Sequence, residues 1–257
     1  MDEIVTEHAG SILRVQLNRP TKRNAMTSAM YLSLASIFGE AANDDSTRVV
    51  LWHGAGDSFC AGNDIEDFLN NPPGPGESPQ ARLMEALVNF DKPLVAAVQG
   101  AAIGGGTTML THCDFIYAGE STKFQMPFVN LAVVPEFGSS CSVPARIGHL
   151  RAAELILLGA PFDARRAAEL GLVTEVVSDK DVLARATETA RKLSAKPAAA
   201  LHASKRLIKQ PFREQIKAAM TAENEEFSAQ VRSEDAKEAV TAFLEKRKPD
   251  FTRSIKS

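Results

Sequence analysis

Residues 94–106 read Leu-Val-Ala-Ala-Val-Gln-Gly-Ala-Ala-Ile-Gly-Gly-Gly, an apolar run that ends in three consecutive glycines. The first five residues have the length and composition of a buried strand. Gly104, Gly105 and Gly106 are expected to open an apolar helix, so that their backbone N–H groups can meet an anion at a helix N-terminus. Met109 stands where the dinucleotide motif G-x-G-x-x-G needs its third glycine, which excludes that motif. The structural alternative is close packing of the helix against the strand.

The chain around this run predicts an α/β fold. Strands are expected at residues 3–8, 12–17, 49–52, 94–98, 114–118 and 173–177. The first two should form a hairpin around Gly10, and Thr27 can cap a helix that runs to about Ala42. Strands that alternate with helices favour parallel pairing, with the helices covering the sheet.

After about Gly148 the pattern becomes helical. Helices are expected at residues 151–158, 164–170, 181–193, 197–209, 212–227 and 234–246. No Ser/Gly-rich linker separates the two halves, so these helices should pack on the sheet or on a neighbouring subunit. Residues 70–76, with three prolines and two glycines, predict a surface loop.

The composition is that of an ordinary globular protein. Of the 257 residues, 44% are hydrophobic and 24% are charged, which argues against a disordered or fibrous protein. The 29 basic and 32 acidic residues leave a net charge of −3, so no nucleic-acid partner is expected. Three cysteines without C-x-x-C spacing predict no zinc site and suit a reducing compartment. No run is apolar enough to span a membrane, and the acidic residues 1–6 are unlike a signal peptide, so a cytoplasmic location is expected.

A second turn, at residues 59–65, and one acidic residue are the other candidates for chemistry. The turn ends a loop and begins a short helix, which should leave backbone donors unpaired near Ala61 and Gly62. Two such turns indicate a pair of amides that converge on one oxygen. Glu136 stands among apolar residues and a proline, where desolvation would raise the pKa of its carboxyl towards a value suited to proton abstraction. A solvated loop glutamate is the alternative.

Taken together, these segments resemble the crotonase superfamily, the enoyl-CoA hydratase and isomerase fold. The motifs that carry the resemblance lie at residues 18–20, 24–26, 59–65, 99–106, 114–118, 167–173 and 243–248. The resemblance implies a crotonase-like spiral of β-β-α turns over residues 1–195. It also implies a C-terminal helical region, residues 196–257, that mediates trimerisation, so a homotrimer or a dimer of trimers is expected.

The resemblance further implies an acyl-CoA thioester as substrate, with no resident cofactor or metal. The N–H groups of Ala61 and Gly105 would form the oxyanion hole for the thioester enolate. The expected substrate-binding residues are Arg23, Ala25, Ala61, Gly62, Asn63, Asp64, Ile65, Gly105, Phe128, Phe243 and Lys246. Among them, Phe243 and Lys246 would close the CoA path, from the same chain or from a neighbouring subunit.

Departures from the family pattern bear on the reaction. The hydratases that this chain resembles place two glutamates in the site, at positions that hold Thr108 and Phe128 here. Neither side chain does acid–base chemistry at neutral pH, and Phe128 excludes water. What remains is Glu136, in a Pro-Glu-x-Gly-Ser-Ser setting similar to that of the monofunctional Δ3,Δ2-enoyl-CoA isomerases. The resemblance therefore implies an isomerase of fatty acid β-oxidation, in which Glu136 moves a proton from C2 to C4 of a 3-enoyl-CoA.

Two alternatives stay open at this point. One is another crotonase-type reaction on an acyl-CoA, such as hydration of an unusual substrate or isomerisation of a ring-derived acyl-CoA. The other is a non-catalytic acyl-CoA-binding or RNA-binding homologue. Its only support is the basic cluster at residues 246–248 with Arg253 and Lys256.

Overall fold

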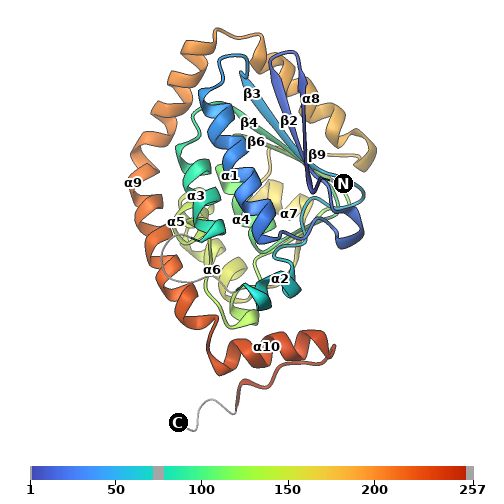
Figure 1. Cartoon of the computed structure of the whole chain (residues 1–257), viewed down its shortest axis with the longest axis vertical. Helices are drawn as coiled ribbons and strands as arrows, with labels where there is room; N and C mark the ends of the chain where they lie inside the picture. The colour runs from blue at the N-terminus through green and yellow to red at the C-terminus, as the bar shows by residue number, and fades with distance from the viewer. Residues whose placement is uncertain (1, 72–77, 253–257) are drawn as a thin grey trace.

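The computed structural model describes residues 2–71 and 78–252, which form two β-sheets surrounded by helices (Figure 1). Most of the expected loop at 70–76, together with Arg253 and Lys256, lies outside these residues. The larger sheet has the strand order β1 (Ile4–Ala9), β2 (Ile12–Leu17), β3 (Val49–Gly54), β4 (Leu94–Val98), β6 (Phe115–Gly119) and β9 (Glu175–Val177). β1 and β2 form the expected antiparallel hairpin, and the later neighbours in this sheet pair in parallel. The predicted α/β fold is confirmed.

Helices account for most of the remaining regular structure. The α-helices are α1 (Ser28–Asn43), α2 (Ile65–Asn70), α3 (Pro79–Asn89), α4 (Gly105–Thr108), α5 (Ser139–Ile147), α6 (His149–Leu157), α7 (Ala164–Glu169), α8 (Val182–Ser194), α9 (Ala198–Gln230) and α10 (Glu234–Leu244). Short 3-10 helices are η1 (Pro20–Lys22), η2 (Met109–His112), η3 (Val129–Leu131) and η4 (Asp179–Asp181). Thr27 caps α1 as expected, because its hydroxyl oxygen accepts a hydrogen bond from the Met30 N–H at 3.2 Å. In the part of the chain that is described, no helix is long and apolar enough to cross a membrane.

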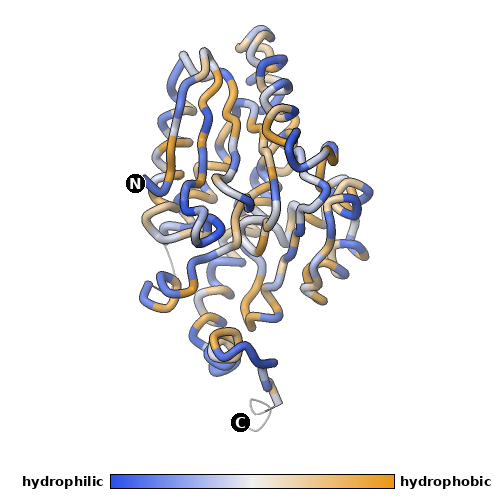
Figure 2. Tube along the Cα trace, turned by 90° about the vertical axis from the view of Figure 1, so that its right-hand side faces the viewer, coloured by the Kyte–Doolittle hydropathy of each residue, from blue (hydrophilic) through white to orange (hydrophobic). Residues whose placement is uncertain are grey.

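The larger sheet is covered on both faces. Successive residues of a strand point to opposite faces, so β3 serves two cores. Val49 and Leu51 pack with α8 on one face, whereas Val50 and Trp52 belong to the main core with α1 and α3 on the other face. The covering helices alternate between hydrophilic and hydrophobic residues along the trace (Figure 2). Burial on both faces explains why the central strands are continuous apolar runs in the sequence.

A second, smaller sheet was not expected from the sequence. It contains β5 (Ala101–Ile103), β7 (Lys123–Gln125) and β8 (Phe162–Asp163). β5 leads directly into the glycine triplet, which opens a buried helix, α4, as expected. α4 ends at Thr108 and continues only as the 3-10 helix η2, because six residues remain before β6 begins at Phe115. The glycines therefore sit at a sharp turn between the two sheets.

The two helices expected at residues 197–209 and 212–227 are in fact one helix, α9, which runs along the whole side of the molecule (Figure 1). Pro211 lies inside it and removes one backbone hydrogen bond. Side chains on both sides of the proline hold the helix in place. Lys205 and Lys209 donate to backbone carbonyls of the core, and Arg213 pairs with Asp91. α9 packs on α3 and α5, while the division of the chain at residue 195 stays a prediction.

Candidate active site

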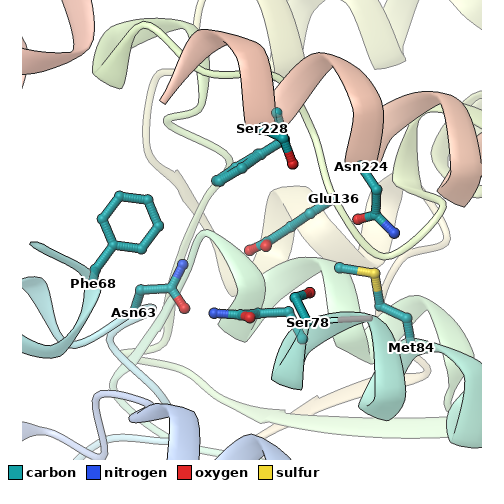
Figure 3. Close-up of a pocket in the computed structure, with 9 residues that line it drawn as sticks. Asn63, Phe68, Ser78, Met84, Glu136, Asn224 and Ser228 are labelled. Atoms are coloured by element: carbon teal, nitrogen blue, oxygen red, sulfur yellow. The ribbon is translucent and has the colours of Figure 1, made fainter. Parts of the chain in front are cut away.

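A narrow pocket lies between α2, α3, α9 and the loop that precedes α5. Its lining residues are Asn63, Phe68, Ser78, Gln80, Met84, Glu136, Asn224, Phe227 and Ser228. Figure 3 shows Glu136 reaching into the space between α3, which carries Met84, and α9, which carries Asn224 and Ser228. The predicted residues Asn63 and Glu136 therefore meet in one cavity.

Glu136 is a buried acid, with 4% of its surface exposed. Burial raises the pKa of its carboxyl to about 8, and the nearby carboxylate of Glu223 adds to the increase. Among the described residues, no group forms a hydrogen bond to the Glu136 carboxylate. The expected desolvated acid is confirmed, and the alternative of a solvated loop glutamate is wrong. At neutral pH such a group can both take and return a proton.

The loop that carries Glu136 is held from two sides. Phe137 and Gly138 both have left-handed backbone conformations, with φ of 64° and 67°. His112 donates from Nε2 to the Phe137 carbonyl at 2.8 Å. The carboxylate of Glu223, on α9, accepts hydrogen bonds from the N–H groups of Gly138 and Ser140, each at 2.7 Å. These contacts fix an unfavourable backbone and so determine where Glu136 points.

Glu223 was missed in the sequence. It lies on a stripe of α9 that also contains Ile216, Met220 and Phe227, at spacings of four, three and four residues. An acid on an apolar helical stripe is the signal that could have found it, because a buried carboxylate needs partners.

The two turns predicted to carry amide donors lie side by side. A Cβ atom added to Gly106 would come within 2.5 Å of the Cys60 carbonyl oxygen, so only glycine fits there. The same addition to Gly105 would come within 2.7 Å of Oε1 of Glu136 and 3.3 Å of the Tyr31 hydroxyl. Gly105 opens α4, and an N–H in the first turn of a helix has no acceptor inside it. The backbone of Gly105 therefore faces the buried acid.

The amide of Ala61 is not free, contrary to the expectation of an unpaired donor. Its N–H donates to the Arg23 carbonyl at 3.0 Å. The reason is that residues 59–63 run between β5 on one side and the segment at residues 23–26 on the other. Cys60 pairs with Ala102 in the first case, and Asn63 pairs with Met26 in the second.

Tyr31 is a further residue beside the site that sequence reasoning did not select. Its hydroxyl donates to Oδ1 of Asn63 at 2.6 Å. Burial, followed by the negative charge of Glu136, raises the pKa of Tyr31 well above its ordinary value. The hydroxyl therefore stays protonated and orients the Asn63 side chain within the cavity.

Several predicted substrate-binding residues lie around the turn at residues 59–65. Arg23 is exposed with φ of 49°, and the carbonyl of Ala25 accepts a hydrogen bond from Arg19 at 2.6 Å. Asp64 pairs with Arg19 at 3.0 Å and caps α2, which begins at Ile65. Gly62 has φ of 93° and accepts a hydrogen bond through its carbonyl from the Met26 N–H.

Four other predicted positions lie away from the cavity lining. Thr108 and Phe128 are buried, and the Thr108 hydroxyl is 3.4 Å from the Gly104 carbonyl. Phe243 and Lys246 are exposed on and just after α10, which packs against η3 of the same chain. As for metals, the described ranges 2–71 and 78–252 contain no group of three or more His, Cys, Asp or Glu that could hold an ion.

Comparison with known proteins places the chain in a family. The sequence model of the family "Enoyl-CoA hydratase/isomerase" matches residues 7–254. The 1,2-epoxyphenylacetyl-CoA isomerase of Escherichia coli is 33% identical, over 98% of this chain and 99% of its own. The 2,3-dehydroadipyl-CoA hydratase of the same organism is 31% identical over the same shares. The crystal structure of an enoyl-CoA hydratase/isomerase from Pseudoalteromonas atlantica superposes with a TM-score of 0.93 at 37% identity, covering 98% of this chain and all of that one. The chain belongs to the enoyl-CoA hydratase/isomerase family of the crotonase superfamily, whose reactions act on acyl-CoA thioesters.

Proposed function

We propose that the protein is a Δ3,Δ2-enoyl-CoA isomerase with Glu136 as its single acid–base group. The observation that carries the proposal is the buried carboxylate of Glu136 beside Gly105, in a cavity whose other lining residues carry no ionisable side chain. The charge of Glu223 acts on Glu136, but the carboxylate of Glu223 already accepts hydrogen bonds from two backbone N–H groups. One proton shuttle is sufficient to move a double bond, because no atom of water is added.

The proposed reaction has two proton transfers. The ionised Glu136 takes a proton from C2 of a 3-enoyl-CoA, and the electron pair moves onto the thioester oxygen to give a dienolate. The N–H of Gly105 donates to that oxygen, and the N–H of Ala61 turns from the Arg23 carbonyl to the same atom. The protonated Glu136 then gives its proton to C4, and the double bond forms between C2 and C3.

Two positions at which this chain departs from the family's hydratases support isomerisation over hydration. A hydratase needs a group to activate water and a second group to supply a proton. Thr108 and Phe128 stand where the family's hydratases carry glutamates, and both are buried. For the CoA moiety, our proposal assigns Arg23, Ala25, Asp64, Ile65, Phe243 and Lys246. It also includes a trimeric assembly through the C-terminal helices.

The test is to incubate the protein separately with trans-3-hexenoyl-CoA and trans-2-hexenoyl-CoA. We expect the conjugated thioester chromophore to appear with the first substrate, and no water adduct in the mass spectrum of the second. Glu136→Gln should lower isomerase kcat by about 10²- to 10⁴-fold. Glu225→Gln, an exposed change on α9, is the matched control and should leave kcat unchanged. Near-native turnover of the Glu136 variant would refute the assignment, and addition of water to 2-hexenoyl-CoA would show a hydratase.

One relative favours a second candidate, the isomerisation of a ring-derived acyl-CoA. The Escherichia coli relative is named as an isomerase of 1,2-epoxyphenylacetyl-CoA. The cavity also has aromatic walls, since Phe68 and Phe227 meet edge to face with centroids 6.1 Å apart. Inert 3-hexenoyl-CoA combined with turnover of an epoxidised ring thioester would favour this candidate.

A further inference from the structure

Gln80 is a buried polar residue of the cavity that the proposed reaction does not use. It lies in the first turn of α3, after the capping residue Ser78, and 7% of its surface is exposed. Its Oε1 atom is buried and has no hydrogen-bond partner in the described structure. A buried amide oxygen without a donor costs free energy, and the large majority of buried side-chain polar atoms in proteins are paired. Because Gln80 lines the same cavity as Glu136, a bound molecule can supply the missing donor.

Other polar groups face the same cavity. Asn224 and Ser228 line it from α9, and the hydrogen bonds found within residues 2–71 and 78–252 do not engage either side chain. Asn63 uses its oxygen to accept from Tyr31, and its amide N–H groups have no acceptor in the same ranges. A plain hydrocarbon chain would bury all these groups without satisfying them. The wall composition therefore fits an acyl chain that carries a polar group.

The charges of the cavity limit what this polar group can be. Its lining contains no Lys, Arg or His among the described residues, and it does contain Glu136. Glu223 adds a second acid nearby, close enough to raise the pKa of Glu136 further. A second carboxylate on the acyl chain would be buried beside these acids without a cation to balance it. A neutral donor avoids that repulsion and matches the oxygen of Gln80.

We infer that the preferred substrate of this enzyme carries a hydroxyl group on its acyl chain, and that Gln80 recognises it by accepting its hydrogen bond. The inference rests on the proposed isomerase function and narrows its substrate class. Gln80 contributes to specificity, while Glu136 does the chemistry. Asn63, Asn224 and Ser228 complete the polar wall that receives the hydroxyl group.

The experiment compares four 3-enoyl-CoA thioesters of equal chain length. They are 3-hexenoyl-CoA, its 5-hydroxy and 6-hydroxy forms, and the terminal carboxylate 3-hexenedioyl-CoA. We expect kcat/KM for at least one hydroxylated form to exceed that of 3-hexenoyl-CoA by about 10-fold to 100-fold. Gln80→Met should remove this preference, so that the ratio of kcat/KM for the hydroxylated form to kcat/KM for 3-hexenoyl-CoA falls to about 1. Gln210→Met, an exposed change on α9, should keep the preference.

The outcomes separate this inference from the proposed function. Equal or better turnover of 3-hexenoyl-CoA in the unmodified enzyme overturns the role of the hydroxyl group while isomerase activity stands. Preference for the dicarboxylate overturns the argument from charge. A parallel loss on all substrates in Gln80→Met shows a structural role for Gln80. Silence on all four substrates overturns the proposed isomerase itself. The substrate preference of the unmodified enzyme decides the matter even when Gln80→Met fails to fold.

Discussion

The two ends of α9 differ in whether polar side chains that face the protein have hydrogen-bond partners. Before Pro211, Lys205 donates to the Lys92 carbonyl at 2.6 Å and pairs with Asp114 at 2.8 Å, so its charge is fully engaged. Towards the other end, Asn224 and Ser228 line the cavity, and their side chains form no hydrogen bond within the described chain. Paired polar groups hold the helix on the core, whereas unpaired ones are available to a ligand. The pattern of pairing thus separates scaffold from site on a single helix.

Glu223 lies next to Asn224 on α9, but it is paired like Lys205 and also acts on the cavity. Its carboxylate is buried and accepts two backbone hydrogen bonds, as a scaffold group does. The same charge lies near Glu136 and contributes to its raised pKa. Glu223 is therefore the point at which the anchoring of α9 influences the chemistry of the cavity.

Removing a paired cation should have the largest effect on stability. Lys205→Met takes away the partner of Asp114 and a donor to the Lys92 carbonyl. We expect the free energy of unfolding to fall by about 3 kcal/mol. Arg206→Met, on the exposed side of the same turn, should change stability by less than about 0.5 kcal/mol. Urea denaturation followed by circular dichroism measures both. Equal effects of the two variants would contradict the claim that the paired Lys205 side chain holds α9 on the core.

A change at the turn beside the acid should affect rate more than stability. Gly105→Ala places a methyl group 2.7 Å from Oε1 of Glu136, so we expect kcat/KM to fall about 100-fold as the acid is displaced. Gly39→Ala in α1, where the added atom meets nothing within 4 Å, is the matched control. Steady-state kinetics on 3-hexenoyl-CoA gives the result. A Gly105 variant with full activity would mean that the acid and this turn do not work together.

The unpaired acid should lower stability when it is charged. The folded-state pKa of Glu136 is about 8, above its ordinary value of 4.5, so the folded protein holds a proton that the unfolded chain releases between these values. Stability should therefore fall as pH rises from about 4.5 to 8. Glu136→Gln removes this dependence, and we expect it to be more stable than the natural protein by about 2 kcal/mol at pH 9 and nearly equal at pH 4. Thermal unfolding at both pH values tests the sign of this stability difference. A Glu136→Gln variant that is less stable than the natural protein at pH 9 would contradict the prediction.

The smallest expected effect is a shift in a pH profile. If Glu136 acts as a base, kcat/KM should rise with pH and level off near its pKa of about 8. Glu223→Gln removes the neighbouring negative charge, so the inflection should move down by about one pH unit. An unchanged inflection would show that burial alone sets the pKa of Glu136. Glu225→Gln again serves as the control, since it changes an exposed acid on the same helix.

The sequence predicted those helices and strands whose signals lie within a few neighbouring residues. The hairpin and the strand at residues 94–98 were found from apolar runs bounded by turns, and the cap at Thr27 from its residue type. The second sheet could not be found, because its strands of two or three residues are too short to show a period. The continuity of α9 through Pro211 was also missed. The sequence shows that Pro211 should destabilise a helix. It does not show the contacts that Lys205 and Arg213 make with distant parts of the chain, which offset this effect.

The same distinction applies to the site. Glu136 and the two glycine-containing turns were selected because each has a recognisable local setting. Gln80 and Glu223 were not, because an unpaired oxygen or a carboxylate that accepts from another loop becomes visible only in three dimensions. The same limit explains Ala61, whose N–H donates to a carbonyl 38 positions earlier in the chain.

The hydrogen bond from the Gly138 N–H to Glu223 has a consequence for the order of events in folding. The two residues are 85 positions apart, so the loop of Glu136 gains this support only after α9 has docked. Contacts between distant residues form late, since the chain must first close the intervening loop. During synthesis the strands up to β6 are complete long before residue 223 is added. We therefore expect the loop of Glu136 to reach its final conformation only after α9 has been synthesised and has docked, later than the strands that precede it.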